Sequence, residues 1–246
     1  MTTWTVEQRD GVAELRFTRP PDNFMDFGSL IDLGEILAEL STQADRTRVV
    51  MLSSGLGDVF INHAELSDLA KAGKGQATAA ELNSWTHALE LLEELPQPTL
   101  AAIDGLASGG GHELALACTL RVASAQARLQ QPEVPIGIVP GGGGSVRLPR
   151  LVGPGVAADA ILTGREVPAD EALRSGWITA ILPTEDFIDH AWSWASAVAS
   201  APYEAITAAK RLIVDGVRLP FSEAVALERA AFRELAAKSL TGFDDR

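Results

Sequence analysis

The chain contains very little cysteine and comparatively few basic residues. Its 246 residues include one cysteine, Cys118, so no disulfide can form within the chain. Lysine and arginine together number 20, against 33 aspartates and glutamates, and the formal net charge is −13. An acidic surface repels phosphate backbones, so nucleic acid is not expected as a partner.

Long apolar runs are also missing from the sequence. No stretch is long and apolar enough to span a bilayer, so no membrane partner is expected. Residues 1–7 lack the basic region and apolar run of a secretory signal, which favours a cytoplasmic protein. Hydrophobic residues still make up 46% of the chain and charged residues 22%, which is typical of a folded globular protein. Cys118 lies in an apolar stretch and is expected to be a buried thiol.

The first half of the chain alternates between strand and helix patterns. After a turn at residues 10–11, apolar and polar residues alternate through 13–17, which predicts a half-buried strand of a hairpin. Compact β-branched runs at 47–52 and 99–103 predict two further strands. Two apolar stripes at helical spacing predict amphipathic helices. These stripes are Leu30, Leu33, Leu37 and Leu40, and then Leu82, Trp85, Leu89 and Leu92.

The second half ends in helices alone. Pro154 and Gly164 bracket one short helix, and Pro168 and Gly176 another, with proline near the start and glycine past the end. The pattern after residue 202 is almost wholly helical. Strands that alternate with helices and then give way to helices predict an α/β core with a helical C-terminal layer. We place the division between residues 1–190 and 191–246.

Two clusters of glycine interrupt these patterns. Residues 109–113, GGGHE, follow a predicted strand and open a predicted helix, but they lack the G-x-G-x-x-G spacing of a dinucleotide loop. Residues 140–145, PGGGGS, have no lysine before the serine, which excludes a nucleotide triphosphate loop. Dense glycine more simply indicates tight turns and close backbone approach. At the first cluster, the unpaired N–H groups of a helix N-terminus can hold a carboxylate, a phosphate or a developing oxyanion.

Longer motifs surround both clusters. Residues 103–118, IDGLASGGGHELALAC, and residues 131–148, QPEVPIGIVPGGGGSVRL, carry Glu113 and Glu133, which stand 20 positions apart. Together these motifs closely resemble the paired signatures of the enoyl-CoA hydratase/isomerase (crotonase) superfamily, and the resemblance covers nearly the whole chain. It implies an α/β fold with a crotonase-type ββα spiral core that carries the active site. It also implies a helical C-terminal region that serves oligomerisation and covers the active site.

The resemblance further implies an activity, the addition of water across the 2,3 double bond of an enoyl-CoA thioester. Glu113 and Glu133 match the two carboxylates of the hydratases, of which one activates water for attack at C3 while the pair supplies and retrieves the proton at C2. The N–H groups of Ala64 and Gly110 match the two backbone donors that hold the thioester carbonyl. No cofactor or metal is expected, since coenzyme A is part of the substrate. The residues matched to substrate binding are Met25, Ala64, Glu65, Leu66 and Gly110.

Three features depart from the family's pattern. Asn62 and His63 precede Ala64 where the family has small residues, and His63 replaces a glycine. If that glycine requires a positive φ, His63 is strained. Thr119 stands where an aspartate commonly follows the cysteine. The chain ends at residues 244–246 without the further helix and basic stretch of many members, which affects oligomer packing and the binding of the CoA phosphates.

Alternative functions use the same fold. Isomerases, decarboxylases and thioester hydrolases share the oxyanion hole and typically lack one of the two glutamates. A non-catalytic acyl-CoA-binding homologue is another alternative, motivated by residues 62–63 and the short tail. Helix faces within Phe221–Leu235 are expected to be only partly covered in one chain, which predicts a homotrimer or a dimer of trimers. His112 is expected to be packed or solvent-facing rather than catalytic, and Lys210 and Arg211 fit a solvated helix face.

Overall fold

A computed structural model describes residues 3–43 and 46–239. Its strands are β1 (Trp4–Arg9), β2 (Val12–Phe17), β3 (Val49–Ser54), β4 (Val59–Ile61), β5 (Thr99–Ile103), β6 (Leu106–Ser108), β7 (Leu120–Ser124), β8 (Arg128–Gln130), β9 (Val167–Pro168) and β10 (Ala180–Leu182). The larger sheet has the order β1-β2-β3-β5-β7-β10 and is parallel except for the β1–β2 pair. The smaller sheet has the order β4-β6-β8-β9.

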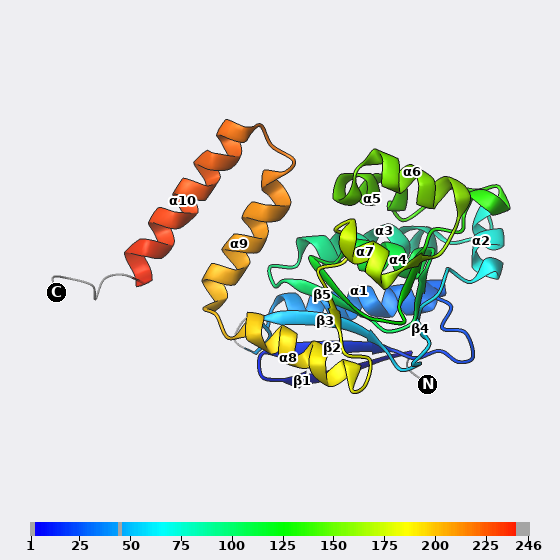
Figure 1. Cartoon of the computed structure of the whole chain (residues 1–246), viewed down its shortest axis with the longest axis horizontal. Coiled ribbons are helices and arrows are strands. Elements are labelled where there is room, and N and C mark those ends of the chain that lie inside the picture. The colour runs from blue at the N-terminus through cyan, green and yellow to red at the C-terminus, as the bar shows by residue number, and fades with distance from the viewer. Residues whose placement is uncertain (1–2, 44–45, 240–246) are drawn as a thin grey trace.

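The helices cover both faces of the larger sheet, and the last two extend away from it (Figure 1). α1, α3 and α4 lie on one face and α8 on the other, as the two separate clusters of buried side chains also indicate. The helices are α1 (Phe27–Ser41), α2 (Leu66–Gly73), α3 (Ala79–Glu94), α4 (Gly110–Ala117), η1 (Val134–Ile136), α5 (Gly144–Val152), α6 (Pro154–Thr163), α7 (Ala169–Arg174), α8 (Phe187–Ala199), α9 (Tyr203–Gly216) and α10 (Phe221–Ser239).

The predicted hairpin is confirmed, but its second strand is buried on both sides rather than half-buried. β1 and β2 pair antiparallel around a turn in which Asp10 and Gly11 both have positive φ. α8 packs on the side of β2 that alternation assigned to solvent. Glu14, on that side, is 1% exposed and accepts hydrogen bonds from Ser53 Oγ and, at 3.2 Å, from Trp192 Nε1. A strand with alternating polar residues can therefore be covered on both faces, because the buried carboxylate of Glu14 has hydrogen-bond partners.

Of the two predicted amphipathic helices, the first is confirmed and the second is partly wrong. In α1 the predicted leucine stripe is fully buried, and Asp26 caps the helix by accepting from Ser29 N. In α3, which Thr78 caps, Leu89 and Leu92 are buried as expected. Leu82 is 50% exposed and Trp85 only half-buried, and both line the cavity that opens at the start of α3.

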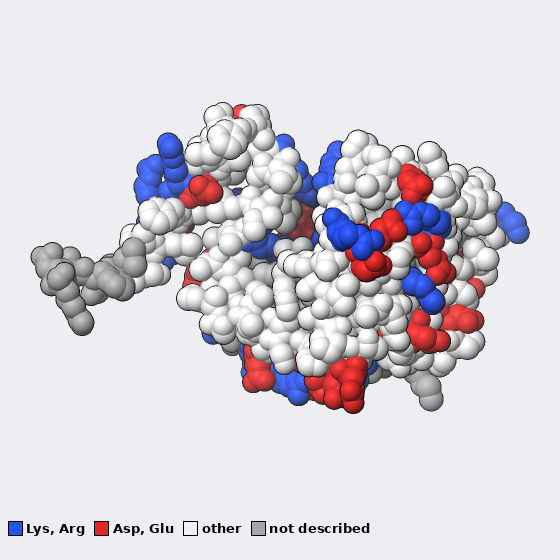
Figure 2. Space-filling model, viewed as in Figure 1, with Lys and Arg blue, Asp and Glu red and all other residues white. Residues whose placement is uncertain are grey.

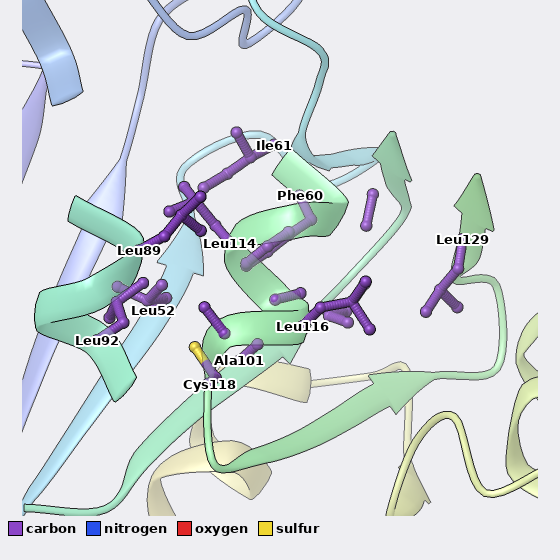
Figure 3. Packing of buried hydrophobic residues seen from close by; sticks show 14 of the residues in the cluster. Leu52, Phe60, Ile61, Leu89, Leu92, Ala101, Leu114, Leu116, Cys118 and Leu129 are labelled. Carbon is purple, nitrogen blue, oxygen red and sulfur yellow. The ribbon is translucent and has the colours of Figure 1, made fainter. Parts of the chain in front are cut away.

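α4 lies between the two sheets and is buried at every position (Figure 3). Leu114 and Leu116 extend from it in different directions, toward the side chains of α3 and toward the smaller sheet. Cys118 follows the helix in the same packed region, and burial raises the pKa of its thiol to about 12, as expected of a structural thiol. The packing fixes the N-terminus of α4 relative to both sheets.

The C-terminal hairpin, α9 and α10, is anchored on the body through a buried lysine. Lys210 on α9 is 4% exposed, and its ammonium donates to the carbonyls of Leu92, Leu95 and Gln97 at the end of α3. The prediction of a solvated face is therefore wrong for Lys210, whereas Arg211 is exposed. An ammonium placed on the last carbonyls of a helix satisfies acceptors that have no partner within that helix.

α10 has no buried residue, and Phe221 and Phe232 are 84% and 68% exposed. The predicted incomplete cover of Phe221–Leu235 is thus confirmed. Across residues 3–43 and 46–239, no helix combines the length and apolar composition that crossing a bilayer requires. The end of the chain at residues 244–246 lies outside the described residues, and the division at residue 190 stays a prediction.

Candidate active site

A cavity of about 420 Å³ opens where the N-terminus of α4, the start of α3 and the glycine loop before α5 meet. Its polar lining includes His63, Glu113 and Glu133. Most of its lining is apolar and includes large side chains that are exposed to solvent. These exposed side chains are Leu66, Leu69, Leu82, Ile136, Ile138 and Val139. A contiguous exposed apolar lining around a few convergent polar groups is typical of a small-molecule site.

Two backbone N–H groups of the cavity wall have no partner in the described part of the protein. Gly110 is the first residue of α4, so its N–H has no acceptor within the helix. Ala64 forms an isolated bridge with Met25, and the hydrogen bonds of that bridge run from Met25 N to His63 O and from Glu65 N to Met25 O. Neither bond uses Ala64 N. Both predicted oxyanion donors therefore line one cavity with their N–H groups unused.

Glycine at position 110 lets the indole of Trp85 lie directly against the backbone. A Cβ at Gly110 would lie 2.0 Å from Trp85 Cη2, so any other residue would force the indole or the backbone to move. The preceding residue, Gly109, has φ 50°, and a Cβ there would lie 2.9 Å from His63 Cβ. The expected reading of this cluster, a tight turn with close backbone approach, is confirmed. The close approach brings the helix N-terminus to the cavity surface.

Glu113 is held at one oxygen and open at the other. Gly142 N and Gly144 N donate to its Oε1 at 2.8 and 2.7 Å. A Cβ at Gly142 would lie 2.6 Å from Glu113 Oε2 and 2.1 Å from Trp85 Nε1, so these two atoms face the same point. Burial raises the pKa of Glu113 to about 7, the two N–H bonds oppose that rise, and repulsion from Glu133 adds to it. A carboxyl group with a pKa near neutrality is suited to general acid–base work.

Glu133 also lines the cavity, from the residue before η1. It is 8% exposed, and its Oε2 has no hydrogen-bond partner among the described residues. Burial raises the pKa of Glu133, while its own backbone N–H and the nearby His63 lower it. An unpartnered buried oxygen is rare in folded proteins, and a ligand or substrate water is one group that satisfies it. Glu113 Oε2 and Glu133 Oε2 are thus both without a hydrogen-bond partner among the described residues.

His63 is not strained, because its φ is not positive, and its replacement of the family's glycine is tolerated by the loop. Its Nδ1 lies 2.8 Å from Ala64 O, and its ring packs 4.5 Å from that of Phe24. Asn62 Oδ1 accepts from His63 N at 2.9 Å. The Ala64 carbonyl is thus occupied by the His63 ring, whereas the Ala64 N–H has no partner among the described residues.

The other residues expected to contact substrate divide into two groups. Met25 and Leu66 line the cavity together with Ala64 and Gly110. Glu65 does not line it, since its carboxylate pairs with Arg19 at 3.0 Å. Its expected substrate contact stays a prediction.

Sequence reasoning missed several residues of the cavity. Trp85 and Leu82 fitted an apolar helix stripe, and only the tertiary structure places them at the cavity. Gly142 and Gly144 were expected as turn residues, and nothing in the local sequence indicates that their N–H groups reach Glu113, 29 and 31 positions earlier. The available signal was the apolar run Ile136, Ile138 and Val139, which is unusual for a glycine-rich loop.

Two further polar residues that the sequence analysis considered, His112 and Thr119, are structural. His112 is buried, accepts at Nε2 from Trp177 Nε1 at 2.7 Å, and contacts the Gln131 amide through Nδ1. Burial lowers the pKa of His112 to about 3, so the ring is neutral, and the expectation that it is packed is confirmed. Thr119 exchanges hydrogen bonds with Thr99, including Thr119 N to Thr99 Oγ1 at 2.8 Å, and so joins the ends of β5 and β7.

Comparison with known proteins agrees with this geometry. Residues 7–244 match the family model described as enoyl-CoA hydratase/isomerase. A short-chain-enoyl-CoA hydratase of Clostridium acetobutylicum is 33% identical over 232 residues, which cover 93% of this chain and 87% of that protein. The crystal structure of an enoyl-CoA hydratase from Bacillus anthracis has a TM-score of 0.87 at 32% identity and covers 94% of this chain and 90% of its own.

A second solved structure, described as an enoyl-CoA hydratase from Geobacillus kaustophilus, has a TM-score of 0.90 at 26% identity and covers 96% of this chain and 89% of its own. The predicted α/β fold of the crotonase type is therefore confirmed. With the two sheets, the paired glutamates and the full-length match, the chain belongs to the enoyl-CoA hydratase/isomerase family.

Proposed function

We propose that this protein is an enoyl-CoA hydratase that adds water across the 2,3 double bond of an acyl-CoA thioester. The observation that carries the proposal is the presence of two buried glutamates, Glu113 and Glu133, each with one oxygen free, on the same cavity as two unused backbone N–H groups. Hydration needs a polarised carbonyl, a held water and a proton for C2, and these four groups supply all three requirements.

The oxyanion stabilisation is assigned to the N–H groups of Ala64 and Gly110. As the nucleophile adds at C3, charge accumulates on the thioester oxygen, and two fixed N–H donors lower the energy of that enolate. Fixed backbone donors are suited to this role, because they do not have to reorganise during the reaction. The packing of α4 and of the residue 62–64 loop holds them in place.

Glu113 and Glu133 are assigned to the water and the proton. Free oxygens on both residues allow one carboxylate to take a proton from the attacking water while the other, protonated, delivers a proton to C2. A pKa of Glu113 raised to about 7 supports this division, because one of two neighbouring carboxyl groups then keeps a proton near neutral pH. The exposed apolar lining suits the acyl chain, with Met25 and Leu66 among its contacts.

We also propose a homotrimer or a dimer of trimers in which α10 packs against another copy. The exposed Phe221 and Phe232 support this proposal, since large aromatic side chains on a helix without buried residues favour association. Cover of the active site by the C-terminal region would then come from a neighbouring copy, because the cavity lining contains no residue of α9 or α10 of the same chain. Sedimentation at micromolar concentration tests this assembly, and a monomer would contradict it.

The activity is tested by steady-state hydration of crotonyl-CoA and of longer and branched enoyl-CoA thioesters. Glu113→Gln and Glu133→Gln keep the side-chain shape and remove the basic oxygen. Each should lower kcat by roughly 10²–10⁴, the range for positioned acid–base catalysis, while KM changes much less. The double variant should lose less than the product of the single losses, because the two residues act as a unit.

Two outcomes would redirect the proposal. Near-normal hydration by Glu113→Gln would exclude the two-carboxylate mechanism. Retention of double-bond migration by that variant would favour an isomerase with Glu133 as the base, which is the alternative that the family's name also contains.

A further inference from the structure

The loop that holds Glu113 is itself held by an arginine from the helix that follows it. Arg147 lies one turn into α5, and its guanidinium folds back so that Nη1 donates to the carbonyl of Gly142. The guanidinium also lies against Gly143, which has φ 93° and where a Cβ would lie 2.2 Å from Arg147 Nη1. The same loop supplies the two N–H groups of Gly142 and Gly144 that bind Glu113 Oε1.

Arg147 is fixed in turn by a carboxylate on α3. Its Nε donates to Glu93 Oε1 at 2.5 Å, and both side chains are only 21% exposed. A guanidinium bound at Nε by one group and at Nη1 by another has little remaining freedom of orientation. The pair is also sheltered enough from solvent to be screened less than a surface ion pair.

The second oxygen of Glu93 reaches the C-terminal hairpin. Arg218, in the connection between α9 and α10, donates to Glu93 Oε2 at 2.9 Å. Glu93 lines a groove of about 680 Å³ between this hairpin and the body, and Figure 2 shows Lys and Arg atoms on both sides of that hollow. One carboxylate therefore joins three elements, α3, α5 and the α9–α10 connection.

We propose that Arg147 is a positioning residue that holds the loop of Gly142 and Gly144 on Glu113, and that Glu93 links this loop to the C-terminal hairpin through Arg218. The expected effect on kcat rests on the proposed function. Arg147 holds the peptide plane that carries the Gly142 carbonyl, and this plane lies directly between the planes of the two donors, Gly142 N and Gly144 N, so it restricts the movement of both. The hairpin then acts on the catalytic carboxylate without touching the cavity.

The pKa of Glu113 distinguishes a positioning role of Arg147 from a purely structural one, because a structural arginine would not change it. Glu133 repels the ionised form of Glu113, whereas Arg147 and the two N–H donors favour it. Loss of Arg147 removes one favourable charge and loosens the donors, so both effects raise the pKa of Glu113. The groups that act on Glu93 are Arg147 and Arg218, with Lys210 also close enough for their charges to interact.

Three variants and one control test the proposal in the full-length protein. Arg147→Met removes the charge and both contacts, and Arg147→Lys keeps the charge but cannot bridge the two partners in the same geometry. Arg218→Met cuts only the link to the hairpin. Arg211→Met removes another exposed charge of the hairpin, on α9, whose ion-pair partner among the described residues is Asp215, at 3.5 Å, and not Glu93.

Two measurements are made on each variant. Side-chain ¹³C NMR follows the titration of Glu113 without any substrate, and crotonyl-CoA hydration gives kcat and KM. Arg147→Met should shift the Glu113 titration above about 7 and lower kcat about 10²-fold, since misplaced catalytic groups lose rate on that scale. Arg147→Lys should lower kcat with a smaller shift. Arg218→Met should lower kcat a few-fold in the same direction, and Arg211→Met should resemble the wild type.

Each result bears on the proposal separately from the proposed function. An unchanged Glu113 titration together with unchanged kcat in Arg147→Lys would overturn the positioning role, even if Glu113→Gln abolishes hydration. If Arg218→Met equals Arg211→Met in both measurements, the link to the hairpin is wrong. Should Arg147→Met fail to fold, Arg147→Lys carries the test. A titration that shifts as expected in a protein without hydratase activity would support the positioning and contradict the function.

Discussion

The N-terminus of α4 and the C-terminal hairpin are held in place by opposite means. Every residue of α4 is buried, and glycines let other atoms approach its first turn within distances that no side chain permits. α10 has no buried residue, and α9 is anchored by Lys210 on three carbonyls. Close packing fixes groups to fractions of an ångström, whereas a polar anchor on an exposed helix leaves its outer surface free for another molecule.

This difference fits the roles proposed for the two regions, an oxyanion donor at the N-terminus of α4 and an association surface on the hairpin. An oxyanion donor must not move while charge develops, and dense packing supplies that rigidity. A hairpin that is proposed to associate with another copy must keep apolar side chains at its surface until it does so. The network of Glu93 is where the two regions meet, because its carboxylate binds arginines from both sides.

The largest effect is expected from adding one methyl group to the rigid region. Gly110→Ala places a Cβ 2.0 Å from Trp85 Cη2, so the indole or the helix N-terminus must move. Overpacking of this kind destabilises by about 1–3 kcal/mol, and displacement of the donor should lower kcat by roughly 10²–10³. Thermal unfolding and crotonyl-CoA turnover measure the two effects.

Gly155→Ala is the matched control for this change. Gly155 lies in α6, is exposed, and a Cβ there would meet nothing within 4 Å. Alanine should stabilise that helix by about 0.5–1 kcal/mol and leave turnover unchanged. If Gly110→Ala behaved like Gly155→Ala, the rigid packing of the α4 N-terminus would not be needed for function.

A smaller effect is expected from removing the anchor of the hairpin. Lys210→Met leaves the carbonyls of Leu92, Leu95 and Gln97 without their donor, which should destabilise the protein by about 1–3 kcal/mol. Hydrogen exchange should increase mainly in α9 and α10, while the amides of α4 stay protected. Arg211→Met, next to it on the exposed side of α9, should change neither. Equal loss of protection in α4 would mean that the two regions unfold as one unit.

The last prediction concerns the pH dependence of stability. The pKa of Glu113 rises from its ordinary value of 4.5 to about 7 on folding, so the folded protein holds this proton more tightly than the unfolded chain. The free energy of unfolding therefore falls as the pH rises from about 4.5 to 7, relative to a variant that cannot titrate there. Glu113→Gln should gain stability over the wild type across that range and keep the gain at higher pH.

Urea denaturation at a series of pH values measures this difference. Glu90→Gln, on the exposed side of α3, measures what the loss of one surface carboxylate does. A constant difference between Glu113→Gln and the wild type from pH 4.5 to 7 would show that burial does not raise the pKa of Glu113.

Much of this protein was determined by the sequence alone. The spacing of apolar residues predicted the hairpin, α1 and the C-terminal helices, because a repeat of two or 3.6 residues decides which side chains can share one face. The motifs around Glu113 and Glu133 indicated the family and the pair of carboxylates, since glycine at fixed positions and two acids at one separation are local features of the chain. The exposed face of α10 was also predicted, because its apolar residues exceed what one short hairpin can cover.

Tertiary structure alone decided the rest. Trp85 belongs to the same stripe as Leu89 in the sequence, but only the arrangement of distant elements decides that one lines the cavity and the other the core. The alternating pattern predicted a solvent-facing Glu14, but α8, which lies nearly 180 residues later in the chain, covers it. Lys210 and Arg211 are adjacent, yet one is buried on carbonyls and the other is exposed. In each case the environment is made by residues distant in the chain, and a local pattern carries no information about which distant group arrives.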